Sequence, residues 1–339
     1  KHLAISLRWS GQEAGGAAYL GSLSVARAME RRSFLKAMEA WKIPCLNFVF
    51  ASVDGDTGWV AAAATPGREG WDGLLPVPGW TNGCRWKGFL PVKDYPQQWQ
   101  PAAGWIATAN HNILPPNYPH TISYDWSPSF RYDRIRERIE QITQSGRKLT
   151  LEDFRSIQQD STSTAARQLA GLWRDISAPD DLKPLAAMLA AWDGHLAADS
   201  AAAALYSVWL QELEKAFWQQ AIATDSKSDR GSLKSLPVMI QALRQPNAAW
   251  FGNENPAAKR DTLMLAALTS AAKRLRKDQG PDPARWTWGA RHQAAFQHPL
   301  ATLSKAHAAA FNLAPVPRPG DETTPNNTKS DTNFKQVHG

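Results

Sequence analysis

Two polar side chains, Asn47 and Arg68, flank an apolar segment and are the residues best suited to chemistry. Residues 46–53 are rich in aromatic and β-branched side chains, residues 54–58 have turn chemistry, and residues 59–64 are apolar again. This pattern predicts a β-hairpin with both strands buried. A carboxamide and a guanidinium at the end of such a hairpin would form one small polar site.

The pairing expected within this hairpin brings the two side chains together at its open end. With the turn centred near Asp56, Asn47 is expected to pair with Ala64 or Thr65. Arg68 then follows roughly 10–13 Å further along at the rise of a strand. Because an arginine side chain covers much of that gap, the sequence predicts that the carboxamide and the guanidinium converge.

The elements that must position the hairpin lie before and after it. One helical face of residues 32–41 is apolar, which predicts a helix packed on the sheet that carries the hairpin;. Residues 70–80 contain Gly and Pro at positions that prohibit regular structure, so their tryptophans are expected to anchor an ordered loop. Residues 2–9 and 104–112 are each expected to form a short strand.

Helical patterns dominate the middle of the chain. Thr150 is suited to cap a helix, because Asp153 stands in the first turn after it;. We expect a mainly helical region over residues 131–285, between a β-rich part of the core at 1–130 and a return to core loops and strands at 286–339. This arrangement belongs to the α+β class. Helices are expected at 131–145, 151–160, 164–176, 181–190, 198–223, 236–244 and 255–277.

The composition excludes several classes of protein. The 339 residues are 43% hydrophobic, which supports a real core;. No apolar run approaches the roughly 20 residues of a membrane span. The net charge is +7, but basic residues are dense only over 131–138 and 273–277, which we expect to be solvated helix faces;. No nucleic-acid-binding motif accompanies them, so neither nucleic acid nor a membrane is expected as a partner.

Cysteines, histidines and tryptophans leave structural alternatives open. Cys45 and Cys84 exclude a disulfide framework, and one bond between them would depend on an oxidising compartment;. For His292 and His298, hydrogen bonds to the backbone or stacking on Trp288 are favoured over metal ligation. Most of the 16 tryptophans flank Gly or Pro, where they anchor loops more often than they bind carbohydrate;. No standard self-sufficient catalytic motif is present.

Short motifs follow one another along almost the whole chain. They are Leu7-Arg8-Trp9, Asn47-Phe48-Val49-Phe50-Ala51, Asp54-Gly55, Gly58, Pro66-Gly67-Arg68, Asp72-Gly73-Leu74-Leu75-Pro76-Val77-Pro78-Gly79-Trp80, Trp86-Lys87-Gly88-Phe89, Ala107-Thr108-Ala109-Asn110-His111-Asn112, Gln158-Gln159-Asp160 with Ser163, Ala191-Trp192-Asp193-Gly194, Trp288-Gly289, His298-Pro299-Leu300 and Gly320-Asp321. Each motif is weak alone. Their succession resembles the β-subunit of the penicillin acylase family of N-terminal-nucleophile hydrolases.

The resemblance implies catalytic roles for Asn47 and Arg68. In that family, the matching asparagine donates a side-chain N–H to the oxyanion of the tetrahedral intermediate, a contribution of ~3–4 kcal/mol to transition-state stabilisation. The matching arginine hydrogen-bonds around the α-amino group of the nucleophile and the oxyanion asparagine. Without the resemblance, Asn47 would be interpreted as a strand-end cap and Arg68 as a surface arginine.

The resemblance also implies parts that lie outside this chain. The family's nucleophile is a serine at the start of the β-subunit, and its own α-amino group acts as the base through water. Because the chain begins at Lys1, we expect it to be a fragment without that serine, without the second oxyanion donor and without the α-subunit, and therefore to be inactive alone. Near the other end, Pro325 stands where relatives have valine.

The expected fold is part of an αββα sandwich with a large helical insertion. The expected function is hydrolysis of an amide between a hydrophobic acyl group and a small amine, such as a β-lactam nucleus, by a periplasmic or secreted enzyme that is cut from a precursor. A structural calcium with unassigned ligands is expected, and no organic cofactor. The alternatives are an acyl-homoserine lactone acylase of the same superfamily and a non-catalytic, Trp-rich binding module.

Overall fold

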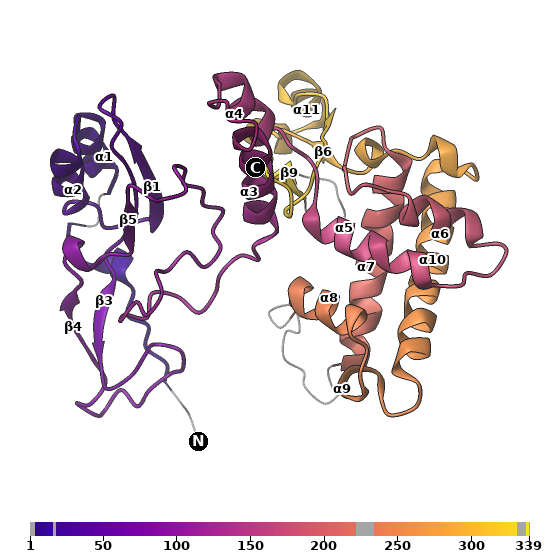
Figure 1. The fold of residues 1–339 in the computed structure, drawn as a ribbon, viewed down its shortest axis with the longest axis horizontal. Helices are drawn as coiled ribbons and strands as arrows, with labels where there is room; N and C mark the ends of the chain where they lie inside the picture. Colours follow the sequence, from indigo (N-terminus) through magenta and orange to yellow (C-terminus); the bar gives the residue numbers. More distant parts are fainter. Residues whose placement is uncertain (1–3, 16–17, 222–233, 331–336, 339) are drawn as a thin grey trace. The chain divides into compact units, whose positions relative to one another are not determined.

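The chain forms two compact units, Lys1–Ser127 and Pro128–Gly339, in a computed structural model (Figure 1). The structure describes residues 4–15, 18–221, 234–330 and 337–338. The division after Ser127 falls close to the start of the predicted helical region. Residues 286–330 belong to the same unit as the helices, and the division into three regions stays a prediction.

A three-stranded antiparallel sheet forms the centre of the first unit. Strands β1 (Leu46–Ala51) and β2 (Thr57–Ala62) make the predicted hairpin, and β5 (Gln97–Trp99) pairs with the other edge of β2. In the turn, the backbone N–H of Ser52 donates to the carbonyl of Asp56 at 2.9 Å. Strand β2 is therefore the central strand of the sheet.

The register of the hairpin differs from the expected one. Asn47 pairs with Ala61, three residues before the expected Ala64. The reason is a turn that lies closer to β1, because strand pairing already begins between Ala51 and Thr57. The tight turn after β1 thus moves every cross-strand partner.

One face of the hairpin packs on helix α2 (Arg31–Met38), which follows α1 (Ala18–Ala26). The rings of Phe34 and Phe50 lie 5.0 Å apart, and those of Trp41 and Phe48 lie 4.8 Å apart, measured between centroids. The predicted helix and its apolar face are confirmed. Because side chains alternate along a strand, Asn47 lies on the opposite face.

The face that carries Asn47 is only partly covered within this unit. Trp59 on β2 is 1% exposed, whereas Val49, its cross-strand partner on β1, is 54% exposed. The expectation that both strands are buried is therefore wrong for β1.

A second, two-stranded sheet follows in the sequence. Strands β3 (Pro66–Glu69) and β4 (Arg85–Phe89) are antiparallel, and the 15 residues between them form the predicted loop without helix or strand. The strands expected at 2–9, of which 4–9 are described, and at 104–112 are absent from the described structure. Neither segment has a partner strand to satisfy its backbone groups. Short 3₁₀ helices occupy Ser10–Gln12 (η1) and Val92–Asp94 (η2).

The second unit is mainly helical, and the predicted helices are confirmed with shifts at their ends. The α-helix predicted over 164–176 ends at Gly171 and continues as a 3₁₀ helix, and residues 222–223 of the helix predicted over 198–223 lie outside the described residues. Thr150 caps its helix as predicted, because its hydroxyl accepts the backbone N–H of Asp153 at 3.3 Å. The helices are α3 (Phe130–Thr143), α4 (Leu151–Gln158), α5 (Thr164–Gly171), α6 (Lys183–Ala190), α7 (Ala201–Ala221), α8 (Leu236–Arg244), α9 (Ala248–Phe251), α10 (Pro256–Gln279) and α11 (Lys305–Phe311). Short 3₁₀ helices lie at η3 (Leu172–Asp175), η5 (Pro283–Arg285), η6 (Trp288–Ala290) and η7 (Pro299–Thr302), and two-residue strands at β6 (Gln293–Ala294), β7 (Val316–Pro317), β8 (Lys329–Ser330) and β9 (Val337–His338).

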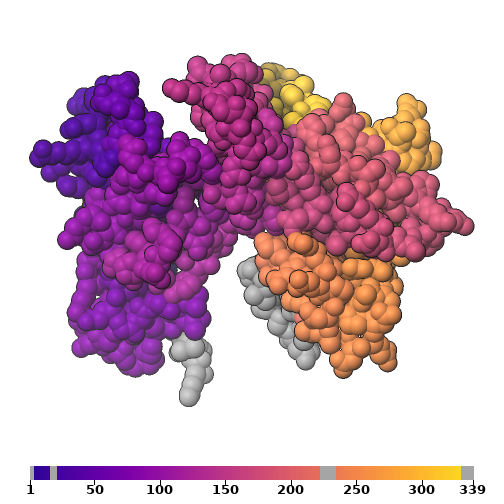
Figure 2. Space-filling model, viewed as in Figure 1, coloured from indigo at the N-terminus to yellow at the C-terminus, as the bar shows by residue number. Residues whose placement is uncertain are grey.

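Helices α7 and α10 pack lengthwise and form the core of this unit (Figure 1). Fully buried alanines on both helices, among them Ala204 and Ala271, allow a close approach of the two backbones. The buried indole of Trp209 donates to the carbonyl of Met264 at 3.1 Å and so joins the two helices. In the space-filling view, the segment from α8 through α9 to the first part of α10 forms one continuous surface, coloured orange (Figure 2).

Polar contacts join distant segments of the second unit beside this core. The Asp160 carboxylate accepts from the guanidinium of Arg134 at 2.9 Å and from the backbone N–H of Thr162 at 2.8 Å. The carbonyl of Asp160 also accepts from the backbone N–H of Asn326 at 3.2 Å. Arg134 is 8% exposed, so the expectation of a solvated helix face over 131–138 is wrong at this residue.

His292 has the structural role that was favoured over metal ligation. Its two ring nitrogens each lie 2.8 Å from a backbone carbonyl, of Arg318 and of Thr328. The imidazole also stacks on Trp288, with 4.5 Å between the ring centroids. Burial holds the pKa of His292 below its usual value, although the two carbonyls oppose this shift. His298 caps η7 through Nδ1, which accepts the N–H of Leu300 at 3.2 Å.

Gly58 on β2 leaves space for the ring of Trp99 on β5. A Cβ atom at this position would lie 2.0 Å from the indole ring. We therefore expect Gly58→Ala to lower the free energy of unfolding by ~1–3 kcal/mol, the usual cost of overpacking. Urea unfolding measures the change. Gly79→Ala is the control, because its Cβ would meet no atom within 4 Å; equal stability losses for both variants would contradict the explanation.

The carboxylate of Asp321 should make the stability of the folded state depend on pH. Asp321 Oδ1 accepts from the backbone N–H of Thr323 at 2.7 Å and from its hydroxyl at 2.6 Å, and that hydroxyl also contacts Ser163 at 2.6 Å. Burial nevertheless raises the pKa of Asp321 from 3.8 to about 6. The folded state therefore holds this proton more tightly than the unfolded state.

This contribution to stability is complete below pH 3.8 and is lost as the pH rises through about 6;. Asp321→Asn keeps an oxygen that can accept both bonds and removes the ionisation. We expect its stability relative to the parent chain to rise between pH 4 and pH 7, by up to about 3 kcal/mol. Urea unfolding across this range measures the difference between the two proteins, and a difference that does not change with pH would contradict the assignment.

Candidate active site

The side chain of Asn47 is held by a neighbour on the same face of the hairpin. The indole Nε1 of Trp59 donates to Asn47 Oδ1 at 2.9 Å. Trp59 pairs with Val49, two residues along β1 from Asn47, so the two side chains are diagonal neighbours across the strands;. Asn47 itself is half-buried.

This contact decides which end of the carboxamide is available. An indole N–H only donates, so it must face the oxygen of the amide rather than its nitrogen. The Nδ2 group of Asn47 then points away from Trp59, and it has no hydrogen-bond partner among the described residues. Asn47 therefore presents a neutral N–H donor that does not titrate.

Arg68 lies on β3, opposite Trp86 on β4, and is enclosed by the loop that follows β3. A Cβ on Gly73 would lie 2.6 Å from Arg68 Nε, so a larger residue there would require the guanidinium to move. Gly73 also has a φ of +89°, a conformation that favours glycine;. The guanidinium lies 5.9 Å from the centre of the Trp71 ring. Arg68 Nε is buried and has no hydrogen-bond partner in the described structure.

The carboxylate of Asp72, which is paired with the hydroxyl of Tyr124, lies near the guanidinium of Arg68. The pKa of Asp72 is held below its usual value, chiefly by a hydrogen bond from the backbone N–H of Leu74 and next by one from the hydroxyl of Tyr124, with a smaller contribution from the charge of Arg68. Burial and the bond to Asp72 raise the pKa of Tyr124. Arg68 thus has a neighbouring negative charge without a direct hydrogen bond to it.

The two candidate residues belong to different sheets. Asn47 lies on the sheet β1-β2-β5 and Arg68 on the sheet β3-β4, and no hydrogen bond joins their side chains. Their catalytic roles stay predictions. Sequence reasoning missed Trp59 and Gly73. The contact of Trp59 with Asn47 follows from the cross-strand register, which was expected three residues away.

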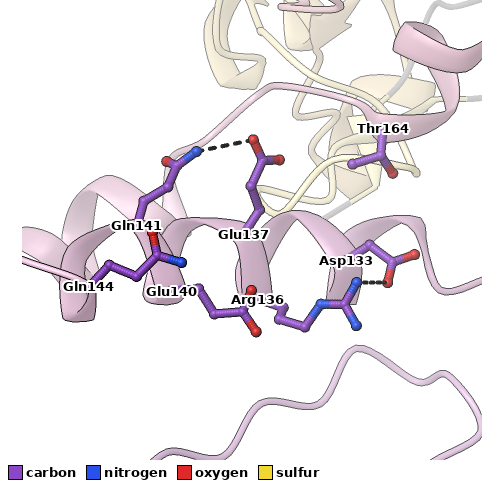
Figure 3. Close-up of a pocket in the computed structure, with 7 residues that line it drawn as sticks. All are labelled: Asp133, Arg136, Glu137, Glu140, Gln141, Gln144 and Thr164. Atoms are coloured by element: carbon purple, nitrogen blue, oxygen red, sulfur yellow. Dashed lines mark hydrogen bonds and ion pairs between the residues drawn. The ribbon is translucent and has the colours of Figure 1, made fainter.

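A hollow on the surface of α3 contains none of the predicted site residues (Figure 3). It measures about 380 Å³ and has a polar lining. Its lining residues are Asp133, Arg136, Glu137, Glu140, Gln141, Gln144 and Thr164. Polar groups of the lining pair with each other. Arg136 forms an ion pair with Asp133, and the side-chain amide of Gln141 donates to Glu137. We assign no reaction to it.

The described residues contain no cluster of metal-ligating side chains and no disulfide. No group of three or more His, Cys, Asp or Glu side chains is placed to hold a metal ion in the parts of the chain that are described. The expected calcium stays a prediction, because calcium also binds carbonyl oxygens. Cys45 and Cys84 are both free thiols. Among the described helices, none is both long and apolar enough to cross a membrane.

Comparison with known proteins gives a match over the full length of the chain. The sequence profile of the penicillin amidase family matches residues 1–339. A curated relative, acyl-homoserine lactone acylase QuiP of Pseudomonas syringae pv. syringae (strain B728a), is 29% identical over 313 residues, which are 83% of this chain and 36% of the relative. Penicillin acylase 2 proenzyme of Pseudomonas sp. (strain SE83) is 27% identical and is matched over 85% of this chain and 37% of its own length. The chain thus spans little more than a third of these relatives.

A solved structure supports the same relationship. Thermostable penicillin G acylase from Alcaligenes faecalis aligns with a TM-score of 0.60 and 25% identity, covering 82% of this chain and 55% of that one. The α+β class and the N-terminal-nucleophile hydrolase fold expected from the sequence are confirmed by this match.

The enclosure of Arg68 by Gly73 can be tested directly. In Gly73→Ala, we expect the guanidinium to move away from the loop, because the added Cβ would lie 2.6 Å from Nε. Gly104→Ala is a matched control, since Gly104 also has a positive φ, +73°, but no atom lies within 4 Å of its Cβ position. Crystal structures of both variants measure the displacement. An unmoved guanidinium in Gly73→Ala would show that the loop does not position it.

Proposed function

Because the chain belongs to the penicillin amidase family, we propose that it forms part of an amidohydrolase that cleaves an amide between a hydrophobic acyl group and a small amine. One contact supports Asn47 as the oxyanion donor. The carboxamide of Asn47 is held at its oxygen by Trp59, while its Nδ2 has no partner among the described residues. That is the arrangement an oxyanion donor needs, because the donor must be in place before the charge develops.

The proposed reaction begins with a serine outside this chain, at the N-terminus of the β-subunit. Its Oγ bonds to the amide carbon, and its proton passes through water to its own α-amino group. The carbonyl oxygen becomes an oxyanion, to which Asn47 Nδ2 donates. Collapse of this intermediate breaks the C–N bond, and the amine leaves with the proton. Water then attacks the acyl ester in the same way and releases the carboxylic acid and the serine.

A neutral donor suits this position better than a charged one. The final product is a carboxylate, and a cation at the oxyanion position would bind it tightly. An amide N–H stabilises the developing charge without attracting the product as strongly. It also keeps the same protonation state over the whole working range of pH.

We propose that Arg68 acts on the base rather than on the oxyanion. A guanidinium near the α-amino group of the serine would disfavour the protonated form of that amine, because like charges repel. The amine would then remain available to accept the proton near neutral pH. The neighbouring Asp72 would limit this effect by its opposite charge.

The acyl group and the amine of the substrate are proposed from the names of the matching relatives. The relatives that match the chain are named as penicillin acylases and as acyl-homoserine lactone acylases. We propose a β-lactam nucleus or a similar small amine as the leaving group. Cleavage of an acyl-homoserine lactone is the second candidate, and it is supported by the QuiP relatives. In both cases the chemistry at Asn47 is the same.

The protein that contains this chain is further proposed to mature from a precursor into two chains, and to act in the periplasm or after secretion. One of the matching relatives is named as a proenzyme, which supports the first of these points. The α-subunit would be the partner that closes the acyl pocket. A structural calcium is also proposed from the resemblance, without assigned ligands.

The role of Asn47 is tested in the full-length, processed protein. We expect Asn47→Ala to lower kcat about 10²–10³-fold with little change in KM, which is the usual loss for one oxyanion donor. Asn47→Asp, nearly isosteric with the parent residue, should lose at least as much, because a carboxylate repels the oxyanion. Steady-state rates are measured on a phenylacetyl amide, an aliphatic β-lactam and a long-chain acyl-homoserine lactone.

The three substrates separate the two candidate functions in the parent enzyme. The highest kcat/KM on a β-lactam would support the first candidate, and the highest on the homoserine lactone would support the second. Asn47→Ala with most of its activity left on all three would remove Asn47 from the mechanism.

A further inference from the structure

We propose that Trp59 is a positioning residue, which aims the Nδ2 group of Asn47 at the oxyanion by holding the other end of the carboxamide. This inference rests on the proposed function of Asn47. It starts from one contact, in which the indole Nε1 donates to Asn47 Oδ1 at 2.9 Å. Trp59 acts only through Asn47 and is not itself expected to touch the substrate.

The orientation of the amide follows from the chemistry of the indole. The two ends of a carboxamide have nearly the same shape, so packing alone does not distinguish them. The N–H of Trp59 does distinguish them, because it needs an acceptor. A flipped carboxamide would turn its own N–H groups toward the indole and leave a buried donor without a partner. We expect this to disfavour the flipped state about tenfold or more.

A flipped carboxamide would also be harmful to the reaction. It would present Oδ1 rather than Nδ2 to the reacting carbonyl, so that an acceptor faced the developing negative charge. The site would then lose its donor and gain a repulsive contact. Each molecule in the flipped state would therefore be almost inactive. Equal population of the two orientations would alone lower kcat about twofold, and rotation of the freed side chain away from the oxyanion accounts for the rest of the loss expected without the bond.

The surroundings of Trp59 make it a rigid support. Its side chain is 1% exposed. It lies on β2, where its backbone pairs with Val49 on β1 and with Gln98 on β5, so the strand is fixed from both sides. An active-site group is held more accurately when its support is a packed side chain on a central strand than when it is a loop.

The same sheet contains a matched control for the loss of an indole N–H. Trp99 on β5 donates from Nε1 to Oε1 of Gln97 at 2.9 Å, which is also a bond from an indole to a side-chain amide. Trp99 packs against the core of α2, beside Phe34, on the face opposite Asn47. Its replacement by phenylalanine removes the same type of bond without a contact to Asn47.

The experiment uses the full-length, processed protein with Trp59→Phe and Trp99→Phe. We expect Trp59→Phe to lower kcat about 5–30-fold, as for the loss of one orienting hydrogen bond, with KM changed less than about twofold. Trp99→Phe should leave both parameters within about twofold. In the double variant Asn47→Ala with Trp59→Phe, kcat should equal that of Asn47→Ala alone, because Trp59 acts through Asn47.

A second replacement covers the case in which Trp59→Phe does not fold. Benzothienylalanine in place of Trp59 keeps the size of the bicyclic ring and exchanges only the N–H for sulfur. It should produce the same loss of kcat, with a melting temperature close to that of the parent.

Two results would overturn the inference while the proposed function stands. The first is an unchanged kcat with benzothienylalanine when Asn47→Ala is strongly impaired. The second is an equal further loss of kcat when Trp59→Phe is added to Asn47→Ala, which would indicate a general effect on the fold. An active Asn47→Ala variant is a different outcome, because it would overturn the proposed role of Asn47 and with it the inference.

Discussion

The alternation of side chains across the β1–β2 pair is the constraint on which the candidate site depends. Phe48 and Phe50 pack on α2, and this burial drives the hairpin against the helix;. Because the period of a strand is two residues, the same packing places Asn47 and Trp59 together on the other face. A slip of one residue would bury the carboxamide in an apolar core and expose both phenylalanines. Core packing and orientation of the site residue are thus consequences of one register.

The second unit is held together by an apolar interface between helices and by polar contacts around Asp160, and the two differ in how strongly they specify their partners. The contact of α7 with α10 buries large apolar side chains, but an apolar interface alone specifies its partners weakly;. The polar contacts of Asp160 are more selective, because a buried carboxylate needs its own donors in place;. The polar contacts of Asp160 also determine where the segment around Asn326 joins the helices, because the backbone N–H of Asn326 donates to the carbonyl of Asp160. Several motifs that resemble the family, including Asp160 and Gly320-Asp321, lie in this polar region, so their presence has a structural explanation independent of catalysis.

The sequence predicted those features that depend on neighbours along the chain. The hairpin, the helix over Arg31–Met38 and the cap at Thr150 follow from local periodicity and turn chemistry. The register was not predictable in the same way, because it depends on a hydrogen bond within the turn. The burial of Arg134 was missed because its partner, Asp160, lies 26 residues away. For the site, the identities of Asn47 and Arg68 came from the resemblance, whereas the contact with Trp59 required the correct register. Local patterns therefore locate the site residues but not what orients them.

The two candidate residues are held by different means, and the difference fits the division of labour in the proposed reaction. An oxyanion donor acts over a hydrogen bond, so the direction of its N–H decides its effect. Asn47 is accordingly held by a directional bond from a rigid central strand. A guanidinium that shifts the pKa of an amine acts through its charge, which depends mainly on distance. For Arg68, enclosure by Gly73 and the ring of Trp71 limits position without a specific bond at Nε. Steric confinement is sufficient for an electrostatic role, whereas an oxyanion donor also requires control of orientation.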